Sequence, residues 1–520
     1  MKLNYKRTIL VGFAFFLICT FWQAYDTIIP KILTDKFGMS QANSGIIMAL
    51  DNILALFMLP LFGAISDKCT SRLGRRTPFI LIGTIAAAVA LIALSFTDGM
   101  QLKNIEAVSA IDDRAALETL YDSVSGTRLE MPDGTEFVLS ETFSRGDFAS
   151  ITSQVEVDGA AVTNPDYTNY VVPARHAYAH AATRANPLPL ILFIGILLVA
   201  LISMATFRSP AVALMPDVTI KPLRSKANAI INLMGTAGGI LVLGMGVVFG
   251  TGAAKNALMP YATFFSIVAG IMLLALLAFM LTVREPKFVR EMETESRRFH
   301  IDELPEGETG KDAKRPLSKE ERASLLLILA SVVFWFMGYN AVISKYSVYA
   351  GKVLDLDYNT TLLLANIAAV AAYLPVGMIA SKIGRKKTIL AGIVMLATSF
   401  GVASFLREGS SALVMNCMFA LAGIGWATIN VNSFPMVVEL SRGGDVGKYT
   451  GFYYTASMAA QVATPMLSGL LMDQFGMHVL FPYAAVFTAL AFFTMLMVKH
   501  GDSKPEAKAG IEVLEDLEAD

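Results

Sequence analysis

Two carboxylates stand inside long apolar segments of this sequence, Asp26 in the first segment and Asp51 in the second. An ionised side chain at the centre of a membrane helix costs roughly 2.5–3.5 kcal/mol on insertion scales, so it persists only where it faces water or a partner. A carboxyl group in such a place can take up and release a proton. We therefore predict that Asp26 or Asp51 binds a proton or a polar ligand. The alternatives are a structural hydrogen bond and, for Asp26, a position near the wet outer interface.

Aromatic and amide side chains occupy the same apolar segments, a combination that suits a polar, uncharged ligand. The apolar face of a pyranose ring packs on Trp or Tyr, while its hydroxyls need donors and acceptors such as Asn and Gln. For any single aromatic residue, packing or interface anchoring is the competing role. Apart from Lys345, which we place at an outer end, the apolar segments are predicted to hold no Lys or Arg, so anionic ligands are disfavoured. The candidate binding residues are Trp22, Gln23, Tyr25, Asn52, Trp335, Tyr339, Asn340, Asn366, Trp426, Asn430, Asn432, Tyr454 and Gln461.

The composition of the chain explains how such residues can be positioned. Of its 520 residues, 54% are hydrophobic and 16% charged, whereas soluble domains are about 25% charged. Many apolar blocks reach the length that a helix needs to cross a bilayer. These features indicate a membrane protein with many spans, and they exclude a soluble enzyme, a secreted disulfide scaffold and a nucleic-acid-binding protein.

Motifs for cofactors and catalysis are missing from the sequence. The three cysteines are scattered, and we find no nucleotide-binding loop, zinc-ligand spacing or nucleophile–base arrangement. We therefore expect no cofactor, no metal site and no catalytic residues, and any driving force would be an ion gradient.

Twelve membrane-spanning helices are predicted from the apolar blocks. Most of the 42 Lys and Arg residues fall in alternate connecting segments, which places both termini in the cytoplasm. The expected spans are residues 8–30, 44–66, 78–97, 187–208, 227–250, 259–283, 323–346, 359–381, 388–406, 411–437, 449–472 and 479–498.

The spans divide the chain into two bundles of six helices and several polar segments. Between helices 3 and 4 lies an acidic insert. It is predicted to start with a helix over Ile105–Tyr121 and to contain a hairpin, with strands 128–130 and 136–139 joined by a turn at 131–134. The expected units are residues 1–97 (N-terminal bundle, helices 1–3), 98–186 (extracytoplasmic insert domain), 187–283 (helices 4–6), 284–322 (cytoplasmic central loop), 323–498 (C-terminal bundle, helices 7–12) and 499–520 (cytoplasmic tail).

The two halves repeat each other in sequence. A Phe-Trp pair in span one recurs in span seven, and a Gly-x-x-Ser-Asp loop ending at Arg76 recurs in weaker form around Arg385. Such repeats predict two bundles related by an axis along the membrane normal, with a binding site between them. Charged residues of these loops could hold the cytoplasmic side closed, with Asp67 paired to a basic residue and to a helix N-terminus across the bundles; fixing the topology is the competing role. Asp217 is expected to pair with Arg208 and Arg224, and Glu439 with Arg442. The predicted cytoplasmic gate comprises Asp67, Arg75, Arg76, Arg208, Asp217, Arg224, Arg385, Glu439 and Arg442.

The duplicated loop resembles the signature of the major facilitator superfamily. Within that superfamily, the chain is similar to the glycoside/pentoside/hexuronide cation symporters and the proton–sucrose symporters. The motifs that carry this likeness are Leu50-Asp51-Asn52, Leu59-Pro60-Leu61-Phe62-Gly63, Arg72-Leu73-Gly74-Arg75-Arg76 and Arg208-Ser209-Pro210. The resemblance implies an all-α membrane protein with twelve helices in two pseudo-symmetric bundles that works by alternating access.

Two departures from the family pattern bear on mechanism. Ser381 stands where the second loop copy usually has Asp, so the two gates are expected to be unequal. Leu59 stands where sodium-coupled members usually carry Asp, which favours proton coupling. We therefore predict proton-coupled symport of a neutral sugar, a glucoside or a disaccharide such as sucrose or maltose, by a monomer in a bacterial inner membrane. The alternatives are a sodium-coupled or exporting carrier of a related solute, and a non-transporting membrane sensor.

Overall fold

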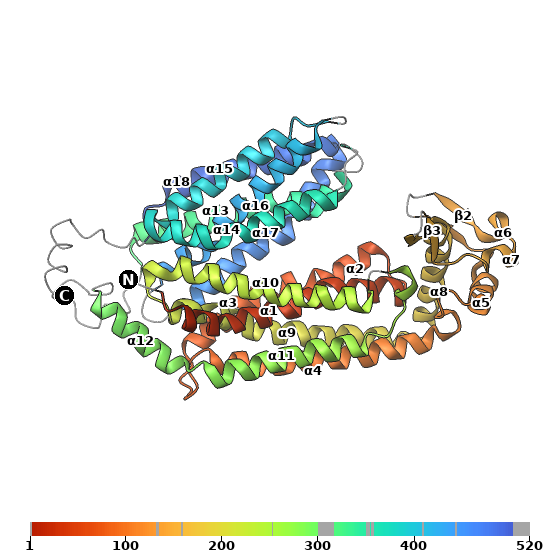
Figure 1. Ribbon diagram of the computed structural model, residues 1–520, viewed down its shortest axis with the longest axis horizontal. Helices are drawn as coiled ribbons and strands as arrows, with labels where there is room; N and C mark the ends of the chain where they lie inside the picture. The colour runs from red at the N-terminus through yellow and green to blue at the C-terminus, as the bar shows by residue number, and fades with distance from the viewer. Residues whose placement is uncertain are drawn as a thin grey trace.

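Long helices dominate the computed structural model, which describes residues 3–131, 135–157, 160–251, 253–299, 317–349, 354, 358–407, 410–441 and 445–502. They form two groups that lie side by side (Figure 1). The N-terminal group contains α1 (Tyr5–Lys31), α2 (Gln41–Met48), α3 (Leu50–Asp67), α4 (Thr77–Asn104), α9 (Leu188–Asp217), α10 (Arg224–Phe249) and α11 (Ala262–Thr282). The C-terminal group contains α13 (Lys319–Tyr349), α14 (Tyr358–Ile383), α15 (Arg385–Ala403), α16 (Ala412–Glu439), α17 (Val446–Phe475) and α18 (Leu480–Met497).

Eleven helices of the described residues are long and apolar enough to cross a membrane. The remaining predicted span, 449–472, is occupied by α17, a helix of 30 residues that is not among the eleven. Lys448 and Gln461, with many Ser, Thr and Gly residues, lower the apolar content of α17. The prediction of twelve spans is therefore supported for eleven of them.

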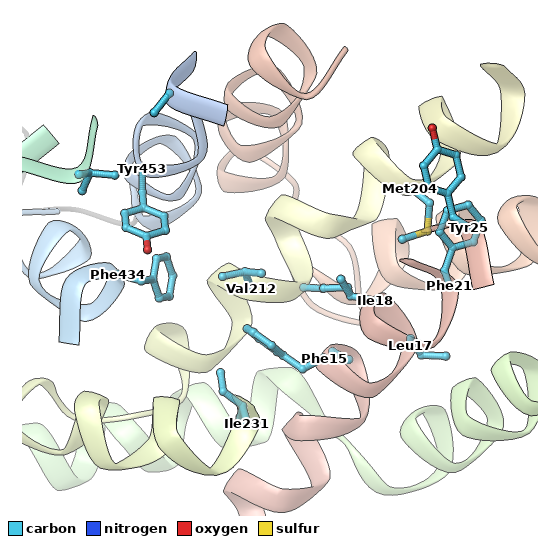
Figure 2. Packing of buried hydrophobic residues seen from close by; sticks show 14 of the residues in the cluster. Phe15, Leu17, Ile18, Phe21, Tyr25, Met204, Val212, Ile231, Phe434 and Tyr453 are labelled. Carbon is cyan, nitrogen blue, oxygen red and sulfur yellow. The ribbon is translucent and has the colours of Figure 1, made fainter. Parts of the chain in front are cut away.

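Within the N-terminal group, bulky apolar side chains alternate with small residues. Phe15 and Ile18 of α1 point toward Val212 of α9 and Ile231 of α10 (Figure 2). Gly238 of α10 lies so close to α1 that an added Cβ would lie 2.7 Å from the carbonyl oxygen of Phe16. Small residues allow membrane helices to approach in this way, because lipid offers no hydrophobic drive for their association.

The segment between α4 and α9 forms mixed secondary structure around a hydrophobic cluster of its own, which includes Leu117, Leu120, Phe148 and Tyr167. The predicted hairpin is present, with Leu129 opposite Phe137, although its turn residues 132–134 lie outside the described residues. The helix expected from residue 105 begins instead at residue 114, after a short 3-10 turn. The elements are α5 (Arg114–Val124), β1 (Arg128–Glu130), β2 (Glu136–Val138), α6 (Leu139–Thr142), α7 (Arg145–Phe148), β3 (Gln154–Val157), β4 (Ala160–Thr163) and α8 (Val172–Ala185).

A buried ion pair fastens the base of this segment to the N-terminal group. The Lys36 ammonium lies 2.5 Å from the Asp98 carboxylate, and the two side chains are 0% and 1% exposed. Asp98 also accepts a hydrogen bond from the Tyr261 backbone N–H at 3.1 Å. Gln101 donates to the Lys36 carbonyl at 2.8 Å and to the Thr183 hydroxyl at 3.0 Å. We call these five residues the insert anchor.

The molecule has two distinct ends. The segment between α4 and α9 projects beyond one end of the N-terminal group, which we call the insert end (Figure 1). At the opposite end, α11 is followed by α12 (Glu285–Arg298), a helix that leaves the group at an angle, and we call this the α12 end.

Candidate functional site

At the α12 end, a buried charge network centres on Arg76, whose side chain is 0% exposed. Its guanidinium donates to Asp217 at 2.7 Å and to Asp67 at 2.6 Å. Asp67 in turn accepts hydrogen bonds from the backbone N–H groups of Gly447 and Lys448, both at 2.9 Å, in the first turn of α17. A helix N-terminus attracts a carboxylate because its N–H groups and dipole are positive. The two partners predicted for Asp67 are thus both present, and they join the two groups of helices.

The related network of the second half centres on Arg385, which is 1% exposed. Its guanidinium donates to Glu439 at 2.8 Å and to the Ser225 hydroxyl at 3.0 Å, and it also contacts the Lys221 carbonyl. Ser225 and Lys221 lie at the start of α10, so this network also crosses between the groups. Ser381 donates only within its own helix, to the carbonyl of Gly377 at 2.9 Å.

Three members of the predicted gate need comment. Arg75 lies 3.5 Å from Asp217, at the edge of the first network. The Arg224 guanidinium lies 3.6 Å from Glu439, across the two groups, and donates to the Pro216 carbonyl next to Asp217 at 3.1 Å; its pairing with Asp217 stays a prediction. Arg442, the expected partner of Glu439, lies outside the described residues.

Arg208 corrects one expectation, because it lies between the helix groups and not in the gate. The predicted span ended at residue 208, but α9 continues to Asp217. Nine further residues of helix displace Arg208 from the gate by about 13 Å. The guanidinium lies 5.2 Å from the ring centre of Trp22 and 5.0 Å from that of Tyr454. The apolar segments therefore do contain an interior cation, contrary to the sequence-based expectation.

Both predicted carboxylates lie within electrostatic range of this guanidinium. Among the described residues no ion pair joins Arg208 to Asp26 of α1 or to Asp51 of α3, so the attraction acts at longer range. Asp26 is exposed and Asp51 is half-buried. Asn52 donates to the Asp51 carboxylate at 2.8 Å. We call Trp22, Asp26, Asp51, Arg208 and Tyr454 the central polar set.

On the C-terminal side, an aromatic platform lies between α13 and α16. Tyr339 and Trp426 stack with ring centres 3.8 Å apart and planes 2° from parallel. Tyr373 of α14 lies within electrostatic range of Tyr339 and of Cys19 in α1, and Cys19 lies within electrostatic range of Arg208. The platform and the central polar set are therefore neighbours, contributed by different halves of the chain.

Some predicted binding residues are buried in packing contacts. Trp335 is 0% exposed and lies within the hydrophobic core, so the prediction that it faces a ligand is wrong for this conformation. Its face of α13 packs on α18: one turn earlier Ser331 contacts Thr494 at 2.7 Å. Asn432 is also 0% exposed and donates to the carbonyl of Thr428 in its own helix, at 2.8 Å. Tyr25 is 1% exposed and donates to the Met48 carbonyl at 3.3 Å.

Of the other predicted amide side chains, some make contacts within their own helix and others do not. Asn366 is exposed and donates to the Leu362 carbonyl of its own helix, while Gln461 contacts the Met458 sulfur. Gln23 is half-buried on the face of α1 toward Gly239 of α10. The Asn340 amide nitrogen is buried without a partner in the described part of the chain. Asn430 contributes its backbone carbonyl, which accepts from Asn228 at 3.2 Å.

Two further residues of the site escaped the sequence analysis. Glu285, at the start of α12, accepts hydrogen bonds from the backbone N–H groups of Arg75, Arg76 and Thr77 at 2.7–3.1 Å. Asn228 of α10 donates to the carbonyls of Asn430 and Val431 in α16. Pro286 marked a helix start at Glu285, but nothing in the sequence indicated partners some 200 positions away.

Comparison with protein families gives two matches that together cover both halves of the chain. The family model described as Major Facilitator Superfamily matches residues 177–431 and 359–515. The model described as MFS/sugar transport protein matches residues 10–108.

Curated relatives match short stretches of the chain. Sucrose transport protein SUC3 of Arabidopsis thaliana is 43% identical over 68 residues, 13% of this chain and 11% of the relative. Proton-associated sugar transporter A of Homo sapiens is 41% identical over 68 residues, 13% of this chain and 9% of the relative. MFS-type transporter ppzB of Metarhizium rileyi is 24% identical over 138 residues, 26% of this chain and 28% of the relative. The chain thus spans less than a third of the length of each of these relatives.

Solved structures resemble the chain over nearly its whole length. The proton:xylose symporter XylE, bound to 6-bromo-6-deoxy-D-glucose, has a TM-score of 0.56 at 13% identity and covers 98% of this chain and all of its own. FucP in the outward conformation also has a TM-score of 0.56, at 12% identity, over 95% of this chain and 98% of its own. At these identities the likeness concerns the fold.

Proposed function

Because the chain belongs to the major facilitator superfamily, we propose that it is a secondary transporter that carries a neutral sugar together with a proton. The sugar would be a glucoside or a disaccharide such as sucrose or maltose. The sugar-transport family match at residues 10–108 and the short matches to sucrose transport proteins support the substrate class. The observation on which the proposal depends is the central polar set, in which the Arg208 guanidinium lies over the rings of Trp22 and Tyr454, with the carboxylates of Asp26 and Asp51 within its electrostatic range.

The charges of this set explain why a proton would be coupled to transport. With Asp26 and Asp51 both ionised, the set carries one negative charge more than Arg208 neutralises. Uptake of a single proton by either carboxylate makes the set neutral. Because a net charge within the membrane is costly, the neutral set would change conformation more easily. A neutral sugar leaves this balance intact, so the proton and the sugar would move together.

The substrate would bind between the central polar set and the aromatic platform. The stacked Tyr339 and Trp426 offer an aromatic surface to the apolar face of a sugar ring. Asn340 has an amide nitrogen still free to donate, and Asn52 and Gln23 are half-buried nearby on the N-terminal side. The position of Arg208 contradicts the prediction that the interior holds no cation. Because the two carboxylates compensate its positive charge, a neutral substrate is still favoured.

The networks around Arg76 and Arg385 would form the closed gate of the carrier. We propose that the α12 end is cytoplasmic, with α17 as the twelfth span and the segment 98–186 as a domain on the outer face. Cross-group hydrogen bonds at the α12 end, from Asp67, Arg385 and Asn228, then correspond to an outward-facing state. Opening toward the cytoplasm requires these bonds to break.

The test uses purified full-length protein in liposomes with a pH-sensitive dye inside and no sodium gradient. Adding sucrose, maltose and a panel of glucosides outside should acidify the interior with at least one sugar. The Asp26→Asn or the Asp51→Asn variant should lose this acidification and still exchange labelled sugar by counterflow. Asp166→Asn, an exposed carboxylate of the insert, is the matched control and should behave as the unchanged protein.

Two outcomes would contradict the proposal. Counterflow without acidification in the unchanged protein would rule out proton coupling. An absence of both signals across the panel would rule out sugar transport.

A further inference from the structure

A cavity of about 850 Å³ lies at the α12 end, away from the central polar set and beside the gate. Its walls come from the loop between α3 and α4, the last turn of α11 and the polar side of α12. Four basic side chains line it: Arg72, Arg284, Lys287 and Arg290. All four are exposed to solvent.

The acidic residues of the cavity do not neutralise these cations. Glu291 and Glu295 also line it, but both contact Arg7, whose guanidinium is 5% exposed and lies 3.5 Å and 3.1 Å from the two carboxylates. Lys287 lies 3.7 Å from Glu291. Arg72, Arg284 and Arg290 have no ion-pair partner among the residues that the structure describes. The cavity therefore carries an excess of positive charge.

The walls are held in place by contacts on their far sides. Phe288, Val289 and Met292 of α12 pack against the hydrophobic core. Glu285 accepts hydrogen bonds from three consecutive backbone N–H groups of the loop, as described above. The cavity is thus formed without any ligand, and binding would need little rearrangement of the backbone.

The floor of the cavity is apolar and continuous with the lipid-facing surface. Met280 and Val283 at the end of α11 line it together with Leu73, and the neighbouring Leu281 is 71% exposed. A helix with apolar residues on one side and charged residues on the other, placed directly after a membrane span, suits the membrane surface; on α12 the charged side holds both basic and acidic residues. An arginine guanidinium can bind a phosphate group through two parallel hydrogen bonds.

We propose that this cavity binds a phosphate-bearing anion at the membrane surface, of the kind that the headgroup of an anionic phospholipid presents. The three unpaired arginines would hold the phosphate, and the apolar floor would accept the glycerol and the first part of the acyl chains. The placement at the inner surface rests on the orientation proposed above, and anionic lipids are abundant on the cytoplasmic leaflet.

Binding at this place would also act on the gate. Thr77 lines the cavity, and its backbone N–H and hydroxyl both donate to Glu285, at 2.8 Å and 2.7 Å. The adjacent Arg76 holds Asp67. A bound phosphate that bridges Arg72 of the loop and Arg284 of α12 would fasten the two together and favour the closed gate.

The proposal is tested by the thermal stability and ligand affinity of the purified full chain in a neutral detergent. The probes are dioctanoyl phosphatidylglycerol, dioctanoyl phosphatidylcholine and sodium phosphate. The anionic lipid should bind more tightly than the zwitterionic lipid and raise the melting temperature. Binding should weaken about fivefold for each arginine changed to glutamine, and about a hundredfold in Arg72→Gln/Arg284→Gln/Arg290→Gln.

The matched control is Arg297→Gln/Arg298→Gln, which removes exposed charge from the same helix outside the cavity. It should bind the anionic lipid as the unchanged protein does. An equal loss in the control, or equal affinity for the two lipids without any binding of phosphate, would overturn the proposal. Tight binding of sodium phosphate alone would support the phosphate chemistry and make a soluble anion the source.

The single variant Arg290→Gln serves if the triple variant fails to fold. It should still show the fivefold loss. Because the measurement needs no transport, its failure is distinguishable from failure of the proposed sugar–proton symport.

Discussion

The two charge networks at the α12 end occupy equivalent places in the repeat, but opposite charges cross between the halves. In the first network, the Asp67 carboxylate accepts hydrogen bonds at the N-terminus of α17, and Arg76 of the N-terminal group forms an ion pair with it. In the second, the Arg385 guanidinium itself reaches Ser225 and the Lys221 carbonyl at the N-terminus of α10. Ser381, at the place equivalent to Asp67, remains bonded within its own helix.

The helix contacts beside the two networks also differ, and the first half again makes the closer contact. Gly63 of α3 and Gly447 of α17 approach so closely that a Cβ on Gly447 would overlap the Gly63 carbonyl oxygen. At the equivalent place, a Cβ on Gly377 would meet the Ala229 methyl at 2.9 Å. The first half therefore provides the tighter closure, and we expect it to dominate the energy of the gate.

The largest expected effect comes from removing the central arginine of each network. Arg76→Gln leaves Asp217 with Arg75 at 3.5 Å but removes the guanidinium that pairs with the buried Asp67 at 2.6 Å, and breaking a buried ion pair from one side costs about 3–5 kcal/mol. Arg385→Gln leaves only Glu439, which keeps Arg224 at 3.6 Å, so the expected cost is about 1.5–3 kcal/mol. The melting temperature of the purified full chain should fall more for Arg76→Gln.

The control for that comparison is Lys387→Gln, an exposed residue of the second loop, with an expected effect within about 0.5 kcal/mol. Equal losses for the two arginine variants would contradict the unequal gate.

A smaller effect is expected from adding one methyl group at the close helix contacts. In Gly447→Ala the methyl meets backbone that cannot yield, so α3 and α17 must separate, at a cost of about 1–3 kcal/mol. In Gly377→Ala it meets another methyl group and the cost should be lower. Hydrogen–deuterium exchange of the first turn of α17 should accelerate in Gly447→Ala alone; acceleration by both variants would refute the asymmetry.

The smallest effect is a gain of stability from restoring the missing carboxylate. Gly377, one turn before Ser381 on the same face, lies against Lys226 and Ser225 at the start of α10. Ser381→Asp would place a negative charge near this helix N-terminus and near Arg385, with a gain of up to about 1 kcal/mol. The melting temperature should rise at low salt and less at high salt. Ser381→Asn, which adds no charge, should show no such salt dependence.

Much of the fold follows from patterns within short stretches of sequence. Apolar block length indicated the membrane helices, and alternation around Leu129 and Phe137 predicted the hairpin. The partners of Asp67 could also be predicted. A carboxylate at the end of a helix needs hydrogen-bond donors, and the sequence repeat indicated a helix of the other bundle that would begin nearby.

The remaining features depend on partners that are distant in the sequence. A basic residue at the edge of an apolar block looks like a helix end, so Arg208 was assigned to the gate although α9 continues beyond it. Helical periodicity gives the face on which Trp335 lies but not that α18 covers this face. Glu285 was assigned only to the central loop 284–322, because its N–H partners lie on a distant loop near residue 75.

The insert anchor has a mechanical consequence. Lys36, Asp98, Gln101, Thr183 and Tyr261 join the insert to α1, α4 and α11 at the insert end, so we expect the insert to turn with the N-terminal bundle as one rigid arm. During the alternating-access cycle proposed here, a small rotation of that bundle becomes a larger displacement at the tip of the arm. A fluorophore placed at the exposed Glu141 would therefore report the orientation of the carrier from outside the membrane, without disturbing any helix that lines the transport path.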